Sequence, residues 1–261
     1  MTDSLDSIRI DIPNFFVLGA GRCGSTTLYS MLRQHPQIFM PKLKEPSFFC
    51  SYFQVVKDPI SYFNLFTPTE EQFAIGEASH VYLSNPGSAK VIHALIPSAK
   101  FILIFRNPTE RAYSLYHWAR KGKHEPLGSF EEAIEAEEQR YSSAEFFQNC
   151  SHYFWNFMYV RSSYFHLQWE RYLRFYAPRQ FFPLSLNELV SDPLHWIQRI
   201  YDFLGVDRSF APNVEHLNIG GYEPMPAETK LRLDEQFKEV ISATHDLAGR
   251  DMQLYLNSFQ P

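Results

Sequence analysis

Three glycines, two hydroxyls and an arginine share one short turn near the N-terminus of this 261-residue chain. An apolar run at residues 15–18 precedes the turn and predicts a buried strand. Ser25 and Thr26 follow the turn and are predicted to cap a helix. A strand, a glycine turn and a helix in this order direct backbone N–H groups and the positive end of a helix dipole at one point. We therefore expect an anion site here; the alternative is an ordinary turn with an incidental arginine.

The composition of the turn indicates which anion it suits. Gly19 and Gly24 have the spacing of the nucleotide-binding G-x-x-x-x-G-K-[ST] loop, but Ser25 stands where that loop has its lysine. A triphosphate normally needs that lysine and a magnesium ion. Arg22 places a fixed cation with five donors inside the turn instead. The pattern favours a phosphate group of lower charge than a triphosphate.

Two further segments offer groups for acid–base chemistry. Lys44 and Glu45 lie between two prolines, in a segment that is predicted to be a fixed loop, and Glu45 is a candidate general base. The alternative is a solvated charge pair. His80 follows a predicted strand at 73–78, where open α/β sheets bind ligands, and it is the reserve candidate. A single histidine in such a position is more often structural.

A third segment offers a second phosphate site. The apolar run KFILIFR at residues 100–106 predicts a central parallel strand that ends in Arg106. Ser114 lies eight residues later, two turns into the helix predicted at 109–120. An arginine and a serine in this arrangement can bind a second phosphate at the sheet edge that carries the glycine turn. The alternative is an arginine that forms a salt bridge at the end of the sheet.

These segments fit a three-layer, P-loop-like α/β domain with a mostly parallel central sheet flanked by helices. We expect one domain over residues 1–261, with a flexible N-terminal segment at 1–12. Asp58, Ser129 and Asp192 are predicted to open helices. Further strands are predicted at 38–40 and 180–186, and further helices at 58–66, 85–96, 129–139, 158–176 and 193–204.

The composition limits the partners and the compartment. A net charge of −5 and a pI near 6.1 give no basic surface for nucleic acid, and they argue weakly against a large polyanionic substrate. The three cysteines have neither metal-ligand spacing nor an even count, so we expect reduced thiols in a cytoplasmic protein. No apolar run approaches ~20 residues and the N-terminus lacks a signal-peptide core, so no membrane association is expected.

Together, three separated motifs resemble those of the sulfotransferases that use 3′-phosphoadenylyl sulfate (PAPS). The resemblance is to the branch shared by bacterial enzymes and heparan sulfate sulfotransferases. Residues 19–27 resemble the 5′-phosphosulfate loop of that family. The segment Lys44-Glu45-Pro46-x-Phe48-Phe49 resembles its general-base segment, and Arg106-Asn107-Pro108-x-x-Arg111-x-x-Ser114 resembles its 3′-phosphate site. Stretches near residues 129, 203 and 249 also fit, so the resemblance spans nearly the whole chain.

The resemblance implies a metal-free sulfuryl transfer from PAPS to a hydroxyl or amine, which leaves adenosine 3′,5′-bisphosphate (PAP). The acceptor is expected to be a small cytoplasmic metabolite, for example of secondary metabolism. Glu45 would be the base, Lys44 would contact the leaving oxygen or the acceptor, and Arg106 and Ser114 would hold the 3′-phosphate. The implied nucleotide-binding residues also include Arg22, Cys23, Gly24, Ser25, Thr26, Thr27, Gly220, Gly221 and Tyr222.

The chain departs from the family pattern at three places, one of which is Arg22, where some relatives have a lysine. Relatives often have a basic residue in the late loop, where this chain has Gly220 and Gly221, and heparan-type relatives have lysine and proline where Ala78 and His80 stand. Two other functions stay open. One is a kinase-like enzyme with a degenerate phosphate loop, and the other is a non-catalytic nucleotide-binding protein.

Overall fold

A parallel five-stranded sheet is the centre of the computed structural model, which describes residues 11–214 and 221–254. Its strand order is β2-β3-β1-β4-β5, and each pair of neighbours runs parallel. The carboxyl ends of β1, β3 and β4 therefore meet at one edge, which brings the three predicted motifs together. The strands are β1 Phe15–Gly19, β2 Ile38–Phe39, β3 Ala74–Ala78, β4 Lys100–Phe105 and β5 Phe181–Ser185.

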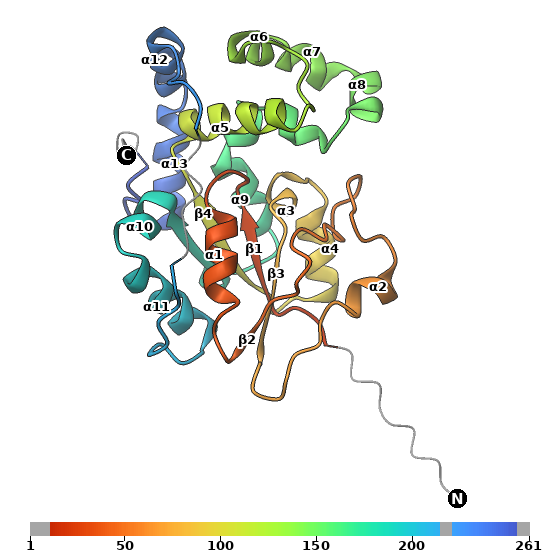
Figure 1. The fold of residues 1–261 in the computed structure, drawn as a ribbon, viewed down its shortest axis with the longest axis vertical. Coiled ribbons are helices and arrows are strands. Elements are labelled where there is room, and N and C mark those ends of the chain that lie inside the picture. Colours follow the sequence, from red (N-terminus) through yellow and green to blue (C-terminus); the bar gives the residue numbers. More distant parts are fainter. Residues whose placement is uncertain (1–10, 215–220, 255–261) are drawn as a thin grey trace, which may run out of the picture.

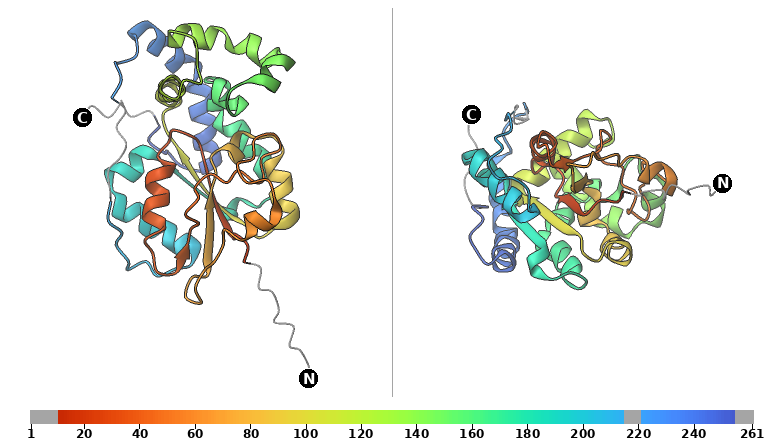
Figure 2. Two further views of the ribbon diagram at one scale, coloured as in Figure 1. Left: turned by 45° about the vertical axis from the view of Figure 1, so that its right-hand side comes forward. Right: turned by 90° about the horizontal axis from the view of Figure 1, so that it is seen from below.

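Helices cover both faces of the sheet, so the three-layer prediction is confirmed (Figures 1 and 2). Within the described residues the helices are α1 Ser25–Leu32, α2 Pro59–Phe63, α3 Val81–Ser84, α4 Ser88–Leu95, α5 Pro108–Lys121, α6 Phe130–Glu135, α7 Glu137–Ser142, α8 Ala144–Asn149, η1 Phe154–Phe157, η2 Arg161–Ser163, α9 Phe165–Leu173, η3 Pro178–Gln180, α10 Leu186–Ser191, α11 Pro193–Leu204, α12 Ala227–Gln236 and α13 Lys238–Ala248. One face carries α1, α10 and α11, and the other carries α4, α9 and α13.

The cover on both faces explains why the central strands are continuous apolar runs. All five residues of β1 are buried, and so are the last five of β4. Beyond the carboxyl edge of the sheet, α5 crosses above the strands, and α6, α7, α8 and α12 lie beyond it (Figure 1). The carboxyl ends of the strands therefore lie below a helical layer rather than in open solvent.

The predicted helix starts at three aspartate and serine positions are confirmed. The side chain of Asp58 accepts a hydrogen bond from the Ser61 amide at 2.7 Å at the start of α2. Asp192 accepts one from the His195 amide at 3.1 Å at the start of α11. Ser129 forms a reciprocal capping box at the start of α6.

Two predicted helices differ from the structure. The acidic helix at 129–139 is divided at Ala136 into α6 and α7. The long helix predicted at 158–176 is wrong, because its first part forms the short η2 turn and α9 covers only Phe165–Leu173. The carboxylate of Glu137 accepts hydrogen bonds from the amides of Val160 and Arg161 at 2.9 and 2.8 Å. These tertiary bonds replace the helical bonds that the apolar pattern predicted.

Two helix starts also differ from their predictions. Gly24 occupies the N-cap position of α1 and no side chain caps it, so Ser25 and Thr26 lie inside the helix rather than before it. The helix predicted at 85–96 begins at Ser88, because Asn85 uses its side-chain oxygen to accept the amides of Gly87 and Ser88. The predicted flexible segment at 1–12 lies almost wholly outside the described residues.

Candidate active site

The glycine turn after β1 has the backbone conformation of an anion site. Gly24 has a φ of +93°, a conformation that disfavours other residues, and it begins α1. The turn is closed by a hydrogen bond from the Cys23 amide to the carbonyl of Ala20 at 3.3 Å. The first turn of α1 has N–H groups with no acceptor inside the helix, as at every helix start. The amides of residues 24–27 are therefore available to an anion.

Arg22 and Ser114 lie in contact, although the sequence assigned them to different phosphate groups. Arg22 has a left-handed backbone with a φ of +69°, and its Nε donates to Oγ of Ser114 at 3.3 Å. Burial lowers the pKa of Arg22; the neighbouring Tyr222 hydroxyl opposes this and the charge of Arg106 adds to it. The glycine turn and helix α5 thus form one positively charged corner.

The side chain of Cys23 is buried in the core beside this corner, where the charges of Arg111, Arg106 and Arg22 act on it. It is fully buried, and burial raises the pKa of its thiol to about 11. The thiol is therefore neutral at physiological pH. Among the predicted nucleotide-binding hydroxyls, Ser25 and Thr27 are nearly buried while Thr26 is exposed.

Arg106 lies at the end of β4, where the sequence predicts the second phosphate site. Its Nη2 is 3.0 Å from Oε2 of Glu110, one turn later in α5. Asn107 caps α5 by accepting the amide of Glu110 at 3.1 Å. The structure thus contains the salt bridge that was the alternative for Arg106. The acidic partner, Glu110, lies on α5, the helix that also carries Ser114.

Arg111 has a role that the sequence reasoning missed. It is 4% exposed, and its Nε donates to the carbonyl of Gly21 at 3.0 Å. Its Nη1 donates to the hydroxyls of Ser162 and Ser163 at 2.5 and 3.1 Å. Burial lowers its pKa to about 10. Arg111 therefore holds the carbonyl side of the glycine turn, and its place in the Arg106-to-Ser114 motif was the available signal.

Glu45 and His80, the two candidate bases, are bonded to each other. Oε2 of Glu45 lies 2.6 Å from Nδ1 of His80 and also accepts the His80 amide at 3.0 Å. Lys44 donates its Nζ to the other carboxylate oxygen. Burial acts to raise the pKa of Glu45, but the bonds and charges of His80 and Lys44 outweigh it and lower this pKa to about 2. Glu45 is therefore ionised at neutral pH.

His80 also packs directly on the glycine turn. A Cβ atom added at Gly21 would lie 2.6 Å from Cδ2 of His80, closer than such atoms approach in real structures. Only glycine leaves room for the imidazole there. The candidate base pair and the anion site are consequently adjacent.

The late loop reaches the same region through Tyr222. Its ring stacks on His117 with centroids 4.3 Å apart and lies edge-on to Tyr113 at 5.4 Å. The Tyr113 hydroxyl donates to the carbonyl of Glu223 at 3.0 Å. These contacts attach the loop to α5. Gly220 lies outside the described residues, and Gly221 is exposed.

A cluster of rings near the candidate bases was not predicted from the sequence. His152 contacts the rings of Phe53, His124 and Trp118 at centroid distances of 4.8, 4.7 and 5.1 Å. Burial, together with the charges of His124 and His80, lowers the pKa of His152 to about 4 against the opposing charge of Glu45, so the imidazole is neutral at physiological pH. No motif marked these residues, because they come from segments far apart in the sequence.

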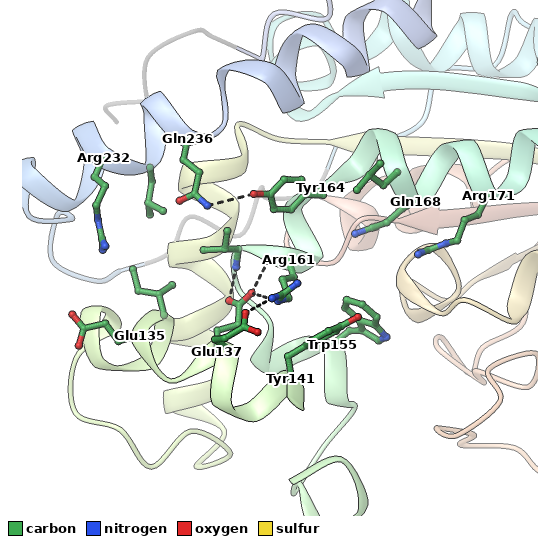
Figure 3. A pocket seen from close by; sticks show the side chains of 15 residues that line it. Glu135, Glu137, Tyr141, Trp155, Arg161, Tyr164, Gln168, Arg171, Arg232 and Gln236 are labelled. Atoms are coloured by element: carbon green, nitrogen blue, oxygen red, sulfur yellow. Dashed lines mark hydrogen bonds and ion pairs between the residues drawn. The ribbon is translucent and has the colours of Figure 1, made fainter. Parts of the chain in front are cut away.

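A cavity of about 540 Å³ lies between α7, η2, α9 and α12 (Figure 3). Arg161 points to the carboxylate of Glu137 on its wall, and Trp155, Gln168 and Arg171 line its other end. None of the predicted site residues lines this cavity. Across residues 11–214 and 221–254, no group of three or more His, Cys, Asp or Glu side chains is arranged to hold a metal ion. No helix in those same ranges is long and apolar enough to cross a membrane.

Comparisons with known proteins converge on one family. Residues 13–239, which contain all of the predicted site residues, match the model described as "Sulfotransferase domain". The chain is 26% identical over 313 residues to the membrane-associated sulfotransferase kil1 of Dictyostelium discoideum, covering 93% of this chain and 66% of that protein. It is 29% identical over 206 residues to the bifunctional heparan sulfate N-deacetylase/N-sulfotransferase 3 of Homo sapiens, covering 75% of this chain and 22% of that protein.

The fold agrees with a solved structure. The crystal structure of a sulfotransferase from Alicyclobacillus acidocaldarius matches with a TM-score of 0.81 and 29% identity, covering 93% of this chain and 98% of that one. The chain thus spans nearly the full length of the bacterial structure. It spans about two thirds of kil1 and about a fifth of the human relative.

Proposed function

Because the chain belongs to the sulfotransferase family, we propose that it transfers a sulfuryl group from PAPS to a hydroxyl or amine of a small acceptor and leaves PAP. The observation that carries the proposal is the contact of three segments at one sheet edge. The glycine turn contacts Ser114 of α5 through Arg22, and it packs against His80, which is bonded to Glu45. An anion site and a candidate base are thereby adjacent.

The donors of the anion site fit the 5′-phosphosulfate group. When bound, PAPS supplies an activated sulfur whose bond to the bridging oxygen of the 5′-phosphate breaks as the acceptor's oxygen or nitrogen bonds to sulfur. Arg22, which bonds Ser114, and the first-turn amides of α1 would stabilise the negative charge that the leaving oxygen keeps. Ser25 and Thr26 would add hydroxyl donors, and Lys44 a cation on the acceptor side. The missing loop lysine at Ser25 supports a reaction without magnesium.

The proton released by the acceptor goes to the Glu45–His80 pair in this proposal. Glu45 is our candidate base, because its carboxylate is ionised and lies beside the turn. His80 is the alternative, because its ring contacts the turn and Glu45 is bonded to Nδ1, which would orient the ring as a carboxylate orients a catalytic histidine. Arg106 and Ser114 would hold the 3′-phosphate, and Tyr222 would bring the late loop over the nucleotide.

We propose a small metabolite as the acceptor, in a cytoplasmic setting that would suit secondary metabolism. The neutral ring of His152 and the aromatic rings around it support a small ring-bearing acceptor. A carbohydrate acceptor is the second candidate, because the printed name of the human relative specifies heparan sulfate. The net charge of −5 favours the first candidate over a sulfated polyanion.

The test is transfer of label from [35S]PAPS to a panel of phenols, alcohols, amines and heparan-type oligosaccharides, with PAP formation measured in parallel. We expect PAP formation that depends on the acceptor. Tight PAP binding without transfer to any acceptor would favour the non-catalytic alternative. Magnesium-dependent ATP hydrolysis without PAPS turnover would favour the kinase-like one.

A further inference from the structure

Glu77 is a buried carboxylate beneath the loop that carries the candidate base. It lies in β3 with no exposed surface, and among the described residues no Lys, Arg or His side chain pairs with it. Its partners are three hydroxyls. Ser79 donates to Oε1 at 2.5 Å, and Tyr62 and Tyr82 donate to Oε2 at 2.7 and 3.0 Å. A buried carboxylate without a cation is costly and calls for an explanation.

Two of the three hydroxyls connect Glu77 to the backbone of the base loop. The Ser47 amide donates to Oγ of Ser79 at 3.1 Å, and the Phe49 amide donates to the hydroxyl of Tyr82 at 3.2 Å. Each amide is thus joined to Glu77 through one hydroxyl. We call these the Ser79 relay and the Tyr82 relay. Tyr62 has no such second bond among the described residues.

The loop needs such anchoring because its backbone is unfavourable. Glu45 and Ser47 have φ values of +64° and +54°, in the left-handed region that side chains other than glycine disfavour. Conformations of this kind persist only where surrounding contacts impose them. Two other bonds help, from the Glu45 amide to the Ala78 carbonyl at 3.0 Å and from the Ser47 hydroxyl to the Glu45 carbonyl at 3.2 Å.

We propose that Glu77 is a positioning residue for Glu45, and that it acts through the Ser79 and Tyr82 relays. A carboxylate can only accept hydrogen bonds, so it obliges both hydroxyls to donate toward it and to present lone pairs to the two amides. A neutral side chain that also carries a donor, such as glutamine, would turn that donor toward one of the two hydroxyls. That hydroxyl could then no longer donate to residue 77 while accepting from its amide. This inference rests on the proposed role of Glu45.

The pKa of Glu77 sets the pH at which the proposal is tested. Burial raises the pKa of Glu77 to about 7; the three hydroxyl bonds oppose this, and the charge of Glu45 adds to it. Glu77 is therefore ionised at pH 8, which is the condition for the test.

A matched pair of variants distinguishes a hydroxyl that holds the base loop through a relay from one that only donates a hydrogen bond to Glu77. Tyr82→Phe and Tyr62→Phe each remove one phenolic hydroxyl from the same oxygen of Glu77, but only the first breaks a relay. At pH 8 we expect Tyr82→Phe to lower kcat about tenfold or more, because small displacements of a catalytic group are costly. PAP affinity should stay within about twofold, and Tyr62→Phe should keep kcat within about threefold of the unsubstituted protein.

Amide hydrogen exchange gives a readout that needs no activity. Tyr82→Phe should speed exchange at Phe49, and Ser79→Ala should speed it at Ser47. Glu77→Gln keeps one acceptor oxygen and gains one donor, so it should speed exchange at one of these two amides. Equal kcat for the two tyrosine variants, or unchanged exchange at Ser47 and Phe49 in Glu77→Gln, would overturn the inference while PAPS transfer by the unsubstituted protein stands. If the unsubstituted protein transfers nothing, the proposed function fails instead, and the exchange rates still decide whether the relays hold the loop.

Discussion

Replacing Arg106 by alanine tests the predicted 3′-phosphate site most directly. Arg106 lies at the end of β4 and its charge acts on Arg22 in the glycine turn, but in this structure its Nη2 bonds to Glu110 at 3.0 Å. The two side chains are 24% and 18% exposed, so their ion pair is only partly screened by solvent. A 3′-phosphate would have to compete with the carboxylate of Glu110 for the guanidinium.

The size of the effect follows from that competition. A charge-assisted hydrogen bond contributes ~1.5–3 kcal/mol, and an i,i+4 ion pair on a helix about 0.3–0.5 kcal/mol. The difference, about 1–2.7 kcal/mol, is what PAP gains from Arg106 and loses in Arg106→Ala. This corresponds to about 5- to 100-fold weaker PAP binding. AMP, which lacks the 3′-phosphate, should change by less than about twofold.

Isothermal titration calorimetry with PAP and AMP measures both affinities on the same proteins. Glu110→Gln is the matched control, and it should change PAP affinity in the opposite direction. It removes the competing carboxylate, and PAP should then bind about twofold tighter, as the ~0.3–0.5 kcal/mol of the pair predicts. Equal losses of PAP and AMP affinity in Arg106→Ala would show that Arg106 stabilises the sheet edge and does not read the 3′-phosphate.

Three further predictions concern the candidate base and the metal. In single-turnover transfer with saturating PAPS, Glu45→Gln should lower the transfer rate ~10²–10⁴-fold while PAP binding stays near normal. His80→Ala should mainly raise the KM for the acceptor. If His80→Ala instead loses the rate and Glu45→Gln does not, the histidine is the base. Chelator should leave PAPS transfer largely intact, and loss that magnesium restores would refute this. Because the Glu45 pKa is lowered from 4.5 to about 2, its contribution to folding, at most ~3 kcal/mol, is present above pH 4.5 and is lost as the pH falls toward 2. In urea unfolding, the difference in unfolding free energy between the unsubstituted protein and Glu45→Gln should become smaller from pH 6 to pH 3. A difference that does not change with pH would contradict the lowered pKa of Glu45.

The sequence predicted the elements whose signals are local. The apolar runs predicted all five strands to within about a residue at each end, because a strand buried on both faces is marked by its own continuous apolar sequence. Capping residues such as Asp58 and Asp192 likewise act within their own turn. The helix predicted at 158–176 failed because bonds from distant groups, Glu137 and Arg111, hold the chain there in another conformation.

For the candidate site, the sequence by itself determined which residues could take part. The glycine turn, the Lys44-Glu45 pair and the strand end at Arg106 were all visible as types and spacings. Only the tertiary structure decided how they combine. Glu45 bonds His80 across 35 positions, Arg22 bonds Ser114 across 92, and Arg111 bonds Gly21 across 90. Such contacts depend on the order of the strands and on residues with a left-handed backbone, such as Glu45. Local sequence preferences do not predict a left-handed backbone at such a residue, because hydrogen bonds from elsewhere in the fold offset its conformational cost.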